Sequence, residues 1–63
     1  MEPLPPIMQY FKFEHLPPKL QVVSAKFFEL ASSLCALLPD GAERSVALRK
    51  LLESKDAAVR AAV

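Results

Sequence analysis

One short segment near the N-terminus carries most of the side chains that could do chemistry. The segment YFKFEHLPP, residues 10–18, holds three aromatic rings, a lysine and the chain's only histidine in front of two prolines. Aromatic rings can stack on nucleobases, and each such contact is worth about 1–3 kcal/mol. The same rings can instead anchor the core of a small fold. The candidate ligand-binding residues of this segment are Tyr10, Phe11, Phe13 and His15.

Three later side chains could bind an anion. Lys26 lies in an otherwise apolar stretch, and its ammonium either faces a phosphate or extends along the helix surface into water. Arg44 and Ser45 open the second predicted helix, where backbone N–H groups and the helix dipole favour anions. Asp40 and Glu43 oppose that preference unless they point away. Lys26, Arg44 and Ser45 complete the candidate set.

The sequence offers no arrangement of residues typical of catalysis or of metal binding. Gly41 is the only glycine, so a glycine-rich phosphate loop is excluded. His15, considered alone, has the position of a turn or cap residue. Together with Cys35, about twenty residues away, it does not make a zinc site. Cys35 is expected to be an inert core residue. The sequence therefore predicts a binding protein, not an enzyme, with no metal and no cofactor.

Composition limits the partners. An apolar fraction of 52% is too high for a disordered chain, yet a core of this size gives only about 3–5 kcal/mol of net stability. With a single cysteine there is no internal disulfide, so self-association is the expected source of further buried surface. The net charge of +1 argues against binding to DNA or RNA polymers. No export signal is visible, and LASSLCALLP is about half the roughly 20 residues of a membrane span, so a cytoplasmic location without membrane contact is expected.

The prolines divide the chain into an arm and two helices within a single domain. Residues 1–17 hold five of the six prolines, which disfavour helix in the residues before them, so we expect an extended arm with a turn around residues 8–11. Pro18 suits the first turn of a helix over about residues 18–38. Asp40 and Glu43 have capping-box spacing before a helix over about residues 41–63. The fold class predicted is all-α: an antiparallel two-helix hairpin with an N-terminal arm.

The first helix has more apolar surface than one partner helix can cover. A first stripe comprises Leu20, Val23, Phe27, Leu30, Leu34 and Leu37. A second stripe comprises Phe28, Ala31, Cys35 and Leu38. In an isolated hairpin the second stripe is exposed, so we expect hairpins to assemble into a homo-oligomer. On the second helix, Asp56 and Arg60 have the spacing of an ion pair on its polar side.

Three pieces of the chain, within residues 10–63, resemble a known family. The first is the aromatic segment that ends in His15, Leu16 and Pro17, and the second is Ala25-Lys26 followed by aromatic and apolar residues. The third and most specific is ERSVALRKLLESKDAAVRA, which is similar to a family pattern of Arg-Ser-x-Ala-Leu with an alanine-rich end. The family is that of small phage proteins that act as sponges for cyclic oligonucleotide signals and counter the CBASS immune system of bacteria. A related hairpin domain occurs in sponges that counter Thoeris.

The resemblance implies an assembly and a ligand. Family members are compact homo-oligomers, typically hexamers, whose pockets between protomers hold cyclic dinucleotides, and some hold cyclic trinucleotides at a separate site. By motif position, Lys26 would contact phosphate and the aromatic before His15 would stack on a base. Here Glu14 occupies the position directly before His15, so Phe13, Phe11 and Tyr10 all remain candidates for stacking. Arg44 and Ser45 match the most specific piece and would contact either ligand or the loop.

Two functions of different classes follow. The first is sequestration of a cyclic di- or trinucleotide in the cytoplasm of an infected bacterium, by mass action and without bond breaking. The second is a hairpin that docks onto another protein through the apolar arm LPPIMQYF, with no small ligand. DNA binding through the second helix is a weaker option because the charges of that helix are mixed.

Overall fold

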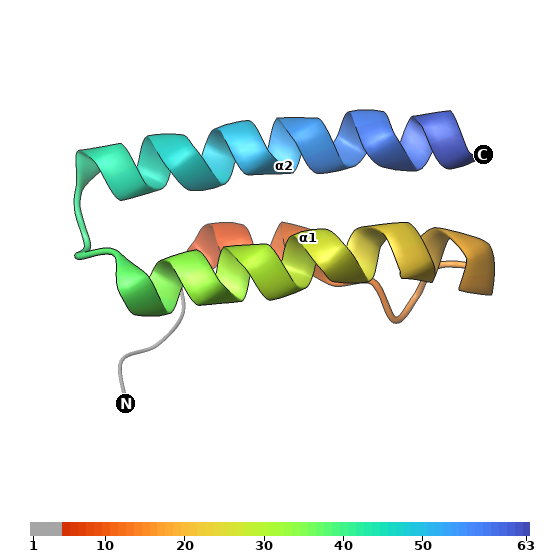
Figure 1. The fold of residues 1–63 in the computed structure, drawn as a ribbon, viewed down its shortest axis with the longest axis horizontal. Coiled ribbons are helices and arrows are strands. Elements are labelled where there is room, and N and C mark those ends of the chain that lie inside the picture. Colours follow the sequence, from red (N-terminus) through yellow and green to blue (C-terminus); the bar gives the residue numbers. More distant parts are fainter. Residues whose placement is uncertain (1–4) are drawn as a thin grey trace.

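A computed structural model describes residues 5–63 as two long antiparallel helices and one short helix (Figure 1). The short 3-10 helix η1 spans Pro6–Phe11. Helix α1 spans Pro18–Leu37 and helix α2 spans Ala42–Ala62. The all-α class and the two-helix hairpin are confirmed, and the helix bounds lie within one residue of the expected ones. The first four residues of the predicted arm lie outside the described residues.

Proline geometry and one side chain determine where α1 begins. Pro18 is its first residue, where a missing N–H costs no hydrogen bond. The side-chain amide of Gln21 then donates to the carbonyl of Leu16 at 2.7 Å and to that of Glu14 at 3.2 Å. These bonds fasten the turn before α1 to its first turn. At the other end Leu38 is extended, as expected for the residue before Pro39.

The start of α2 differs from the predicted capping box. Gly41 is the N-cap residue, and no side chain caps the helix. The Asp40 carboxylate instead accepts a hydrogen bond from the guanidinium of Arg44 at 3.1 Å. This contact takes the Asp40 carboxylate away from the backbone N–H groups at the start of α2. The predicted ion pair on the polar side of α2 is also replaced, because Asp56 lies 3.3 Å from Lys55 rather than paired with Arg60.

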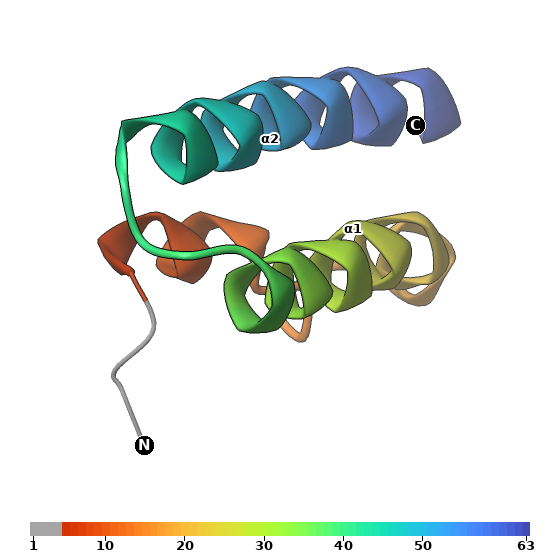
Figure 2. The ribbon, with the colours of Figure 1, turned by 60° about the vertical axis from the view of Figure 1, so that its left-hand side comes forward.

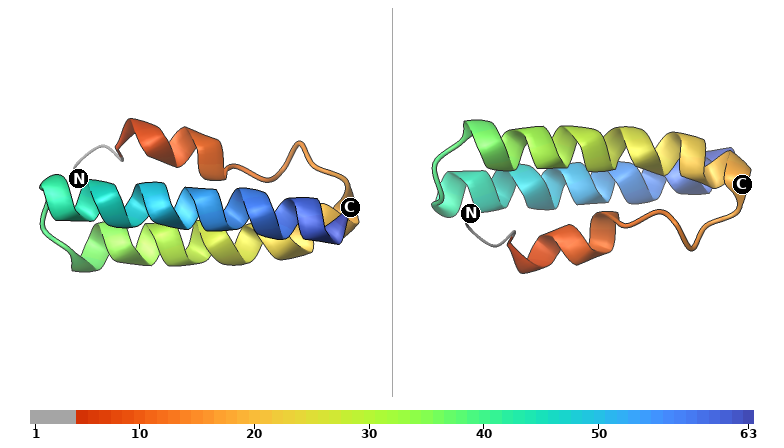
Figure 3. Two further views of the ribbon diagram at one scale, coloured as in Figure 1. Left: turned by 90° about the horizontal axis from the view of Figure 1, so that it is seen from above. Right: turned by 90° about the horizontal axis from the view of Figure 1, so that it is seen from below.

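The arm is the third element of the core. Figures 2 and 3 show η1 lying along the hairpin, beside both long helices. Met8 and Phe11 of η1 form a buried cluster with Ala31 of α1 and Leu48 of α2. Phe28 and Cys35 pack against the same cluster. The second stripe of α1 is therefore largely covered by the chain's own arm, which corrects the prediction that it would be left for another copy.

Small residues let the three elements approach one another. Ser24 and Ala31 are the fully buried residues of α1. They are seven positions apart and so lie on one line along the helix. The short side chain of Ala31 leaves room for the larger Phe11 and Leu48, which are also fully buried. The Ser24 hydroxyl has no hydrogen-bond partner within the described part of the chain.

Part of the predicted first stripe faces outward instead of toward α2. Leu30 is 48% exposed and Leu37 is 77% exposed. With Val22 they belong to an exposed face of α1, which we call the outer stripe. The outer stripe consists of Val22, Lys26, Glu29, Leu30, Ser33 and Leu37. A straight helix has 3.6 residues per turn, so a strict heptad repeat over positions 20–37 does not stay on one narrow face. Leu30 and Leu37 therefore lie away from the contact between α1 and α2.

By length and composition, α1 could cross a membrane. The core helix of a soluble protein and a signal sequence meet the same criterion, so this is weak evidence. The expectation of no membrane contact stays a prediction.

Removal of the Phe11 ring tests whether the arm belongs to the core. We expect Phe11→Ala to cost about 3–5 kcal/mol of unfolding free energy, because a fully buried ring is replaced by a cavity. That is comparable to the whole stability of a domain this small. Urea denaturation followed by circular dichroism measures the change. Tyr10→Ala is the control, since the neighbouring ring is exposed; equal midpoints for both variants would mean that the arm does not pack on the hairpin.

Candidate functional site

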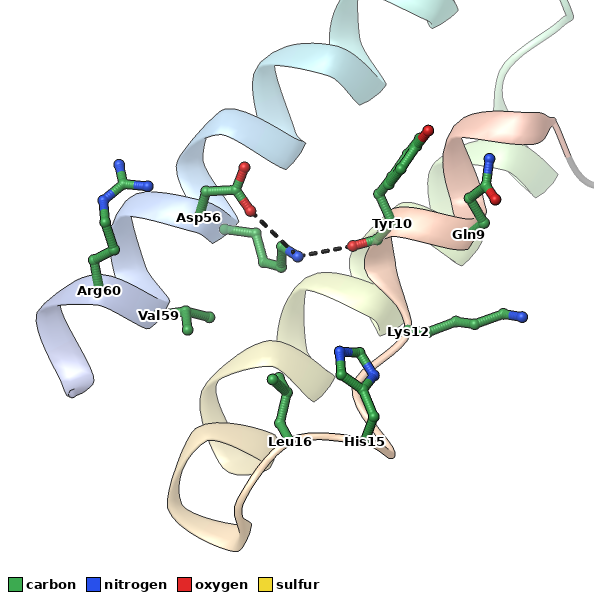
Figure 4. A pocket seen from close by; sticks show the side chains of 9 residues that line it. Gln9, Tyr10, Lys12, His15, Leu16, Asp56, Val59 and Arg60 are labelled. Atoms are coloured by element: carbon green, nitrogen blue, oxygen red, sulfur yellow. Dashed lines mark hydrogen bonds and ion pairs between the residues drawn. The ribbon is translucent and has the colours of Figure 1, made fainter.

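A pocket of about 380 Å³ lies between the arm and the C-terminal half of α2 (Figure 4). Three segments build it: η1, the connection that follows it, and α2. The lining residues are Gln9, Tyr10, Lys12, His15, Leu16, Lys55, Asp56, Val59 and Arg60. The volume is at the lower end of the range of ligand pockets, about 300–1,000 Å³.

Lys55 is the fixed cation of this pocket. Its ammonium donates to the carbonyl oxygen of Tyr10 at 2.7 Å and lies 3.3 Å from the Asp56 carboxylate, as the dashed lines in Figure 4 mark. Only 12% of the side chain is exposed. The Tyr10 carbonyl belongs to the last turn of η1, where unpaired carbonyls and the helix dipole attract a cation. Because an ammonium has three N–H bonds, one remains for a ligand after these two contacts.

Two further cations stand at the rim. Lys12 and Arg60 are exposed, and in Figure 4 their charged ends point away from the middle of the pocket. Both have long, flexible side chains that can turn toward a bound anion. With Lys55 and the opposing charge of Asp56, the lining carries a formal charge of +2 when His15 is neutral. The pocket therefore attracts anions more strongly than the chain's net charge of +1 suggests.

The pocket also has flat and apolar walls. Tyr10 is 59% exposed, so a large part of its ring is accessible. His15 is exposed on the opposite side of the pocket from α2's Asp56, and Leu16 and Val59 add apolar contact below and beside it (Figure 4). The fold thus brings together two of the predicted site residues, Tyr10 and His15, with cations that can bind a charged group.

The other two predicted aromatics have structural positions. Phe11 is fully buried in the core cluster, so neither face of its ring is open to a base. Phe13 packs edge-to-face on Phe28, with ring centroids 5.7 Å apart. Such a pair adds about 0.5–1.5 kcal/mol beyond area burial. Of the three rings considered for stacking, Tyr10 is the one that lines the pocket.

The three predicted cationic and polar residues lie elsewhere. Lys26 is exposed on the outer stripe and is not among the lining residues of this pocket. Arg44 and Ser45 lie in the first turn of α2, at the end of the helix remote from Asp56 and Arg60. Arg44 is largely buried and donates to the Cys35 carbonyl at 3.3 Å as well as to Asp40. It therefore braces the end of α1 and the loop, because the Cys35 carbonyl is one of the last four of that helix.

The sequence did not identify the three lysine and arginine residues that line the pocket, Lys12, Lys55 and Arg60. Lys55 is a charged residue, yet it continues the apolar spacing of α2. Lys55 lies four residues after Leu51, three after Leu52 and four before Val59. A lysine at such a position points its ammonium along the seam with another element, and this periodicity was the available signal. Lys12 and Arg60 had no such signal, since only the folded arm brings them to one pocket.

A second hollow of about 460 Å³ lies beside η1 and has a different character. It is lined by Pro5, Pro6, Met8, Gln9, Lys12, Glu14 and Phe28. Its single lysine is opposed by Glu14, so it offers an anion no excess of positive charge. Across residues 5–63, no three His, Cys, Asp or Glu side chains come together to hold a metal ion.

Comparison with known proteins adds no relative to this geometry. No family model matches the chain, and neither a curated protein nor a solved structure matches it.

The bond between Lys55 and the Tyr10 carbonyl can be tested by Lys55→Met, which keeps the apolar stem and removes the charge. We expect a loss of about 1 kcal/mol, because the carbonyl regains water when it loses its donor. The arm should then detach about five times more often, so trypsin should cut after Lys12 correspondingly faster. Lys50→Met is the control, because Lys50 makes only an exposed contact with Glu53 at 3.9 Å. An unchanged cleavage rate in Lys55→Met would show that this bond does not hold the arm.

The bracing role of Arg44 gives a separate prediction. Arg44→Ala should cost about 1–2 kcal/mol of unfolding free energy, because the largely buried side chain loses its bonds to the loop. Amide hydrogen exchange should rise first at the end of α1 and in the loop. Arg49→Ala, at an exposed position of the same helix, should stay within about 0.5 kcal/mol of the parent. Protection that stays equal in both variants would leave Arg44 without a structural role.

Proposed function

We propose that this chain binds and sequesters cyclic oligonucleotides at the pocket between η1 and α2, without catalysis. One observation carries the proposal: the Lys55 ammonium, bonded to the Tyr10 carbonyl, and the exposed Tyr10 ring line the same pocket, whose lining has a formal charge of +2. A nucleotide needs these two elements, a cation for phosphate and a flat apolar face for the base.

The lining divides naturally between the two parts of such a ligand. Lys12, Lys55 and Arg60 are the phosphate partners in this proposal, with Lys55 fixed and the other two closing from the rim. The Tyr10 ring is the stacking surface, and the Asp56 carboxylate can accept a hydrogen bond from a base amine. This assignment differs from the one that the family resemblance implies, in which Lys26 contacts the phosphate.

A cyclic oligonucleotide suits the pocket better than a nucleic-acid polymer. Polymers are usually bound by an extended basic face, whereas here the positive charge is concentrated around one small pocket on a chain of net charge +1. A short ring of nucleotides also places two phosphates and two bases close together. Sequestration needs only tight binding and many copies of the protein.

The biological setting is part of the same proposal and follows from the resemblance within residues 10–63. It is that of a phage protein in the cytoplasm of an infected bacterium, where it removes a cyclic di- or trinucleotide signal from the host's immune receptor. The assembly in this setting is a homo-oligomer, and the resemblance implies a hexamer.

A thermal-shift panel of cyclic di- and trinucleotides tests the proposal. A ligand that binds only the folded chain raises the melting temperature, because it stabilises the folded state. At a ligand concentration of a hundred times Kd the stabilisation is about 2.7 kcal/mol. Linear dinucleotides and inorganic phosphate serve as controls. No shift with any cyclic nucleotide at ligand concentrations well above micromolar would contradict the proposal. Recovery of intact nucleotide after heat denaturation would separate sequestration from hydrolysis.

Variants of the lining locate the binding site. Tyr10→Ala should weaken binding by about 5- to 150-fold, the equivalent of one stacked base. Arg60→Glu should weaken it as well and make the remaining affinity less sensitive to salt. Arg49→Glu makes the same charge change at an exposed position outside the pocket and should leave the affinity nearly unchanged. If only Lys26→Glu abolishes binding, the ligand lies elsewhere. If no nucleotide binds but a protein co-purifies in stoichiometric amount, the docking function replaces this one.

A further inference from the structure

The outer stripe of α1 is an apolar surface that the fold leaves uncovered. The arm covers the second stripe and α2 covers the inner side, yet Val22 remains 64% exposed, Leu30 48% and Leu37 77%. These side chains are eight and seven residues apart, so they follow one face of the helix over about four turns. Between them on the same face stand Lys26, Glu29 and Ser33.

We propose that the outer stripe pairs with the outer stripe of a second copy of this chain, antiparallel, about a two-fold axis between positions 29 and 30. In such a contact a residue at position i meets the residue of the other copy that is equally far from the axis on the opposite side. Val22 then meets Leu37 at both ends of the interface. Leu30 lies half a residue from the axis, opposite Glu29 and next to Leu30 of the second copy, and Lys26 meets Ser33.

The charges on the stripe complement themselves in this arrangement. Glu29 of each copy lies next to the axis, and Lys26 of each copy stands one turn away on either side of it. The axis therefore gathers two ammonium groups and two carboxylates into a neutral cluster, in which each carboxylate lies between its own Lys26 and that of the other copy. Opposite charges near an interface fix register more than they add affinity.

Self-complementarity is the reason to choose a second copy as the occupant. The point of symmetry lies midway between positions 29 and 30. Apolar positions 22 and 37 are equally far from it, and so are polar positions 26 and 33, while apolar position 30 lies half a residue away. A foreign partner or a lipid surface has no need of that symmetry, and a lipid surface is repelled by Glu29 if anionic. A second copy also supplies the additional buried surface that a chain of 63 residues requires.

The inference deepens the self-association named in the proposed function but does not depend on the nucleotide. The pocket is lined by η1, the connection after it and α2, so it stays accessible in this dimer. The inference also gives Lys26 a role between copies instead of at the ligand. One helix face is smaller than the roughly 800 Å² per partner of a standard interface, so the dimer should dissociate on dilution through the micromolar range.

Sedimentation velocity across that range tests whether the outer stripe is the contact. The parent chain should shift from monomer to dimer as its concentration rises, and Leu30→Lys should stay monomeric with its helical content intact, because Leu30 is already half exposed. Val46→Lys is the matched control, with the same change at an exposed apolar position of α2. A monomeric parent chain, or equal association of the two variants, overturns the proposal.

Charge reversal separates this interface from general stickiness. Lys26→Glu gives four carboxylates around the axis and Glu29→Lys gives four ammonium groups, so each variant alone should be monomeric at low salt. An equimolar mixture should dimerise, because each heterodimer has two charges of each sign. A mixture that remains monomeric, or single variants that dimerise like the parent, contradicts the arrangement.

Disulfide trapping tests the antiparallel register, in a Cys35→Ala background that removes the native thiol. Val22→Cys mixed with Leu37→Cys should cross-link on oxidation, whereas Val22→Cys alone should not. In the proposed dimer the two copies of position 22 are fifteen residues apart along the axis, about 22 Å, far beyond disulfide reach. Efficient cross-linking of Val22→Cys alone would mean a parallel pair. Nucleotide melting shifts measured on the monomeric Leu30→Lys variant show separately whether the pocket binds ligand.

Discussion

The docking of the arm onto the hairpin is the constraint on which the rest of the structure depends. Two helices of about twenty residues expose more of α1 than α2 can cover, and a two-helix hairpin alone encloses almost no core. Phe11 and Met8 solve both problems, because they enter the space between the helices and bury Ala31 and Leu48. Ser24 and Ala31 have small side chains, which lets the arm come close to that side of α1. The domain is therefore a small three-element core rather than a hairpin with a loose tail.

The same docking creates the pocket, so in the proposed function stability and binding would depend on one contact. Lys55 reaches across the seam to the carbonyl at the end of η1, and Tyr10 carries that carbonyl in its backbone and presents its ring to solvent. A ligand held by α2 cations and by the arm would bridge the same seam. Such a ligand would bind the chain with a docked arm more tightly than the chain with a detached arm, and so would favour docking. Conversely, the apparent affinity would fall in proportion to the fraction of chains whose arm is detached. In the proposed function, a substitution at a structural position such as Phe11 would therefore also lower the affinity for the ligand.

The sequence was sufficient to predict the helices but not the contacts among them. Pro18 and Pro39 mark the bounds of α1 because proline acts locally, and the apolar spacing identifies both helices for the same reason. The assignment of faces depended on tertiary packing: Leu30 and Leu37 share a heptad with Phe27 and Leu34 in the sequence, but the space beside Phe27 is the one that α2 and the arm fill. The capping box failed because Arg44 competes for Asp40. Among the site residues, Tyr10 and His15 could be chosen from residue type, whereas Lys12 and Arg60 meet only through the folded arm.

In the proposed dimer, one long face of α1 would serve folding and the other association, and this division would account for the placement of Lys26 and Glu29. The face toward the arm contains only small or apolar side chains and Gln21, because an unpaired charge buried there would cost several kcal/mol. Lys26 and Glu29 are confined to the outer stripe, where they remain hydrated in a monomer and can form a neutral cluster in a dimer. A lysine that served only to keep the helix soluble would not need a glutamate three residues away or leucines beyond it. In the proposed dimer, the exposed leucines and the two opposite charges would let this surface stay hydrated at low concentration and pair with its own copy when the protein is abundant. Sequestration by mass action would need the same abundance.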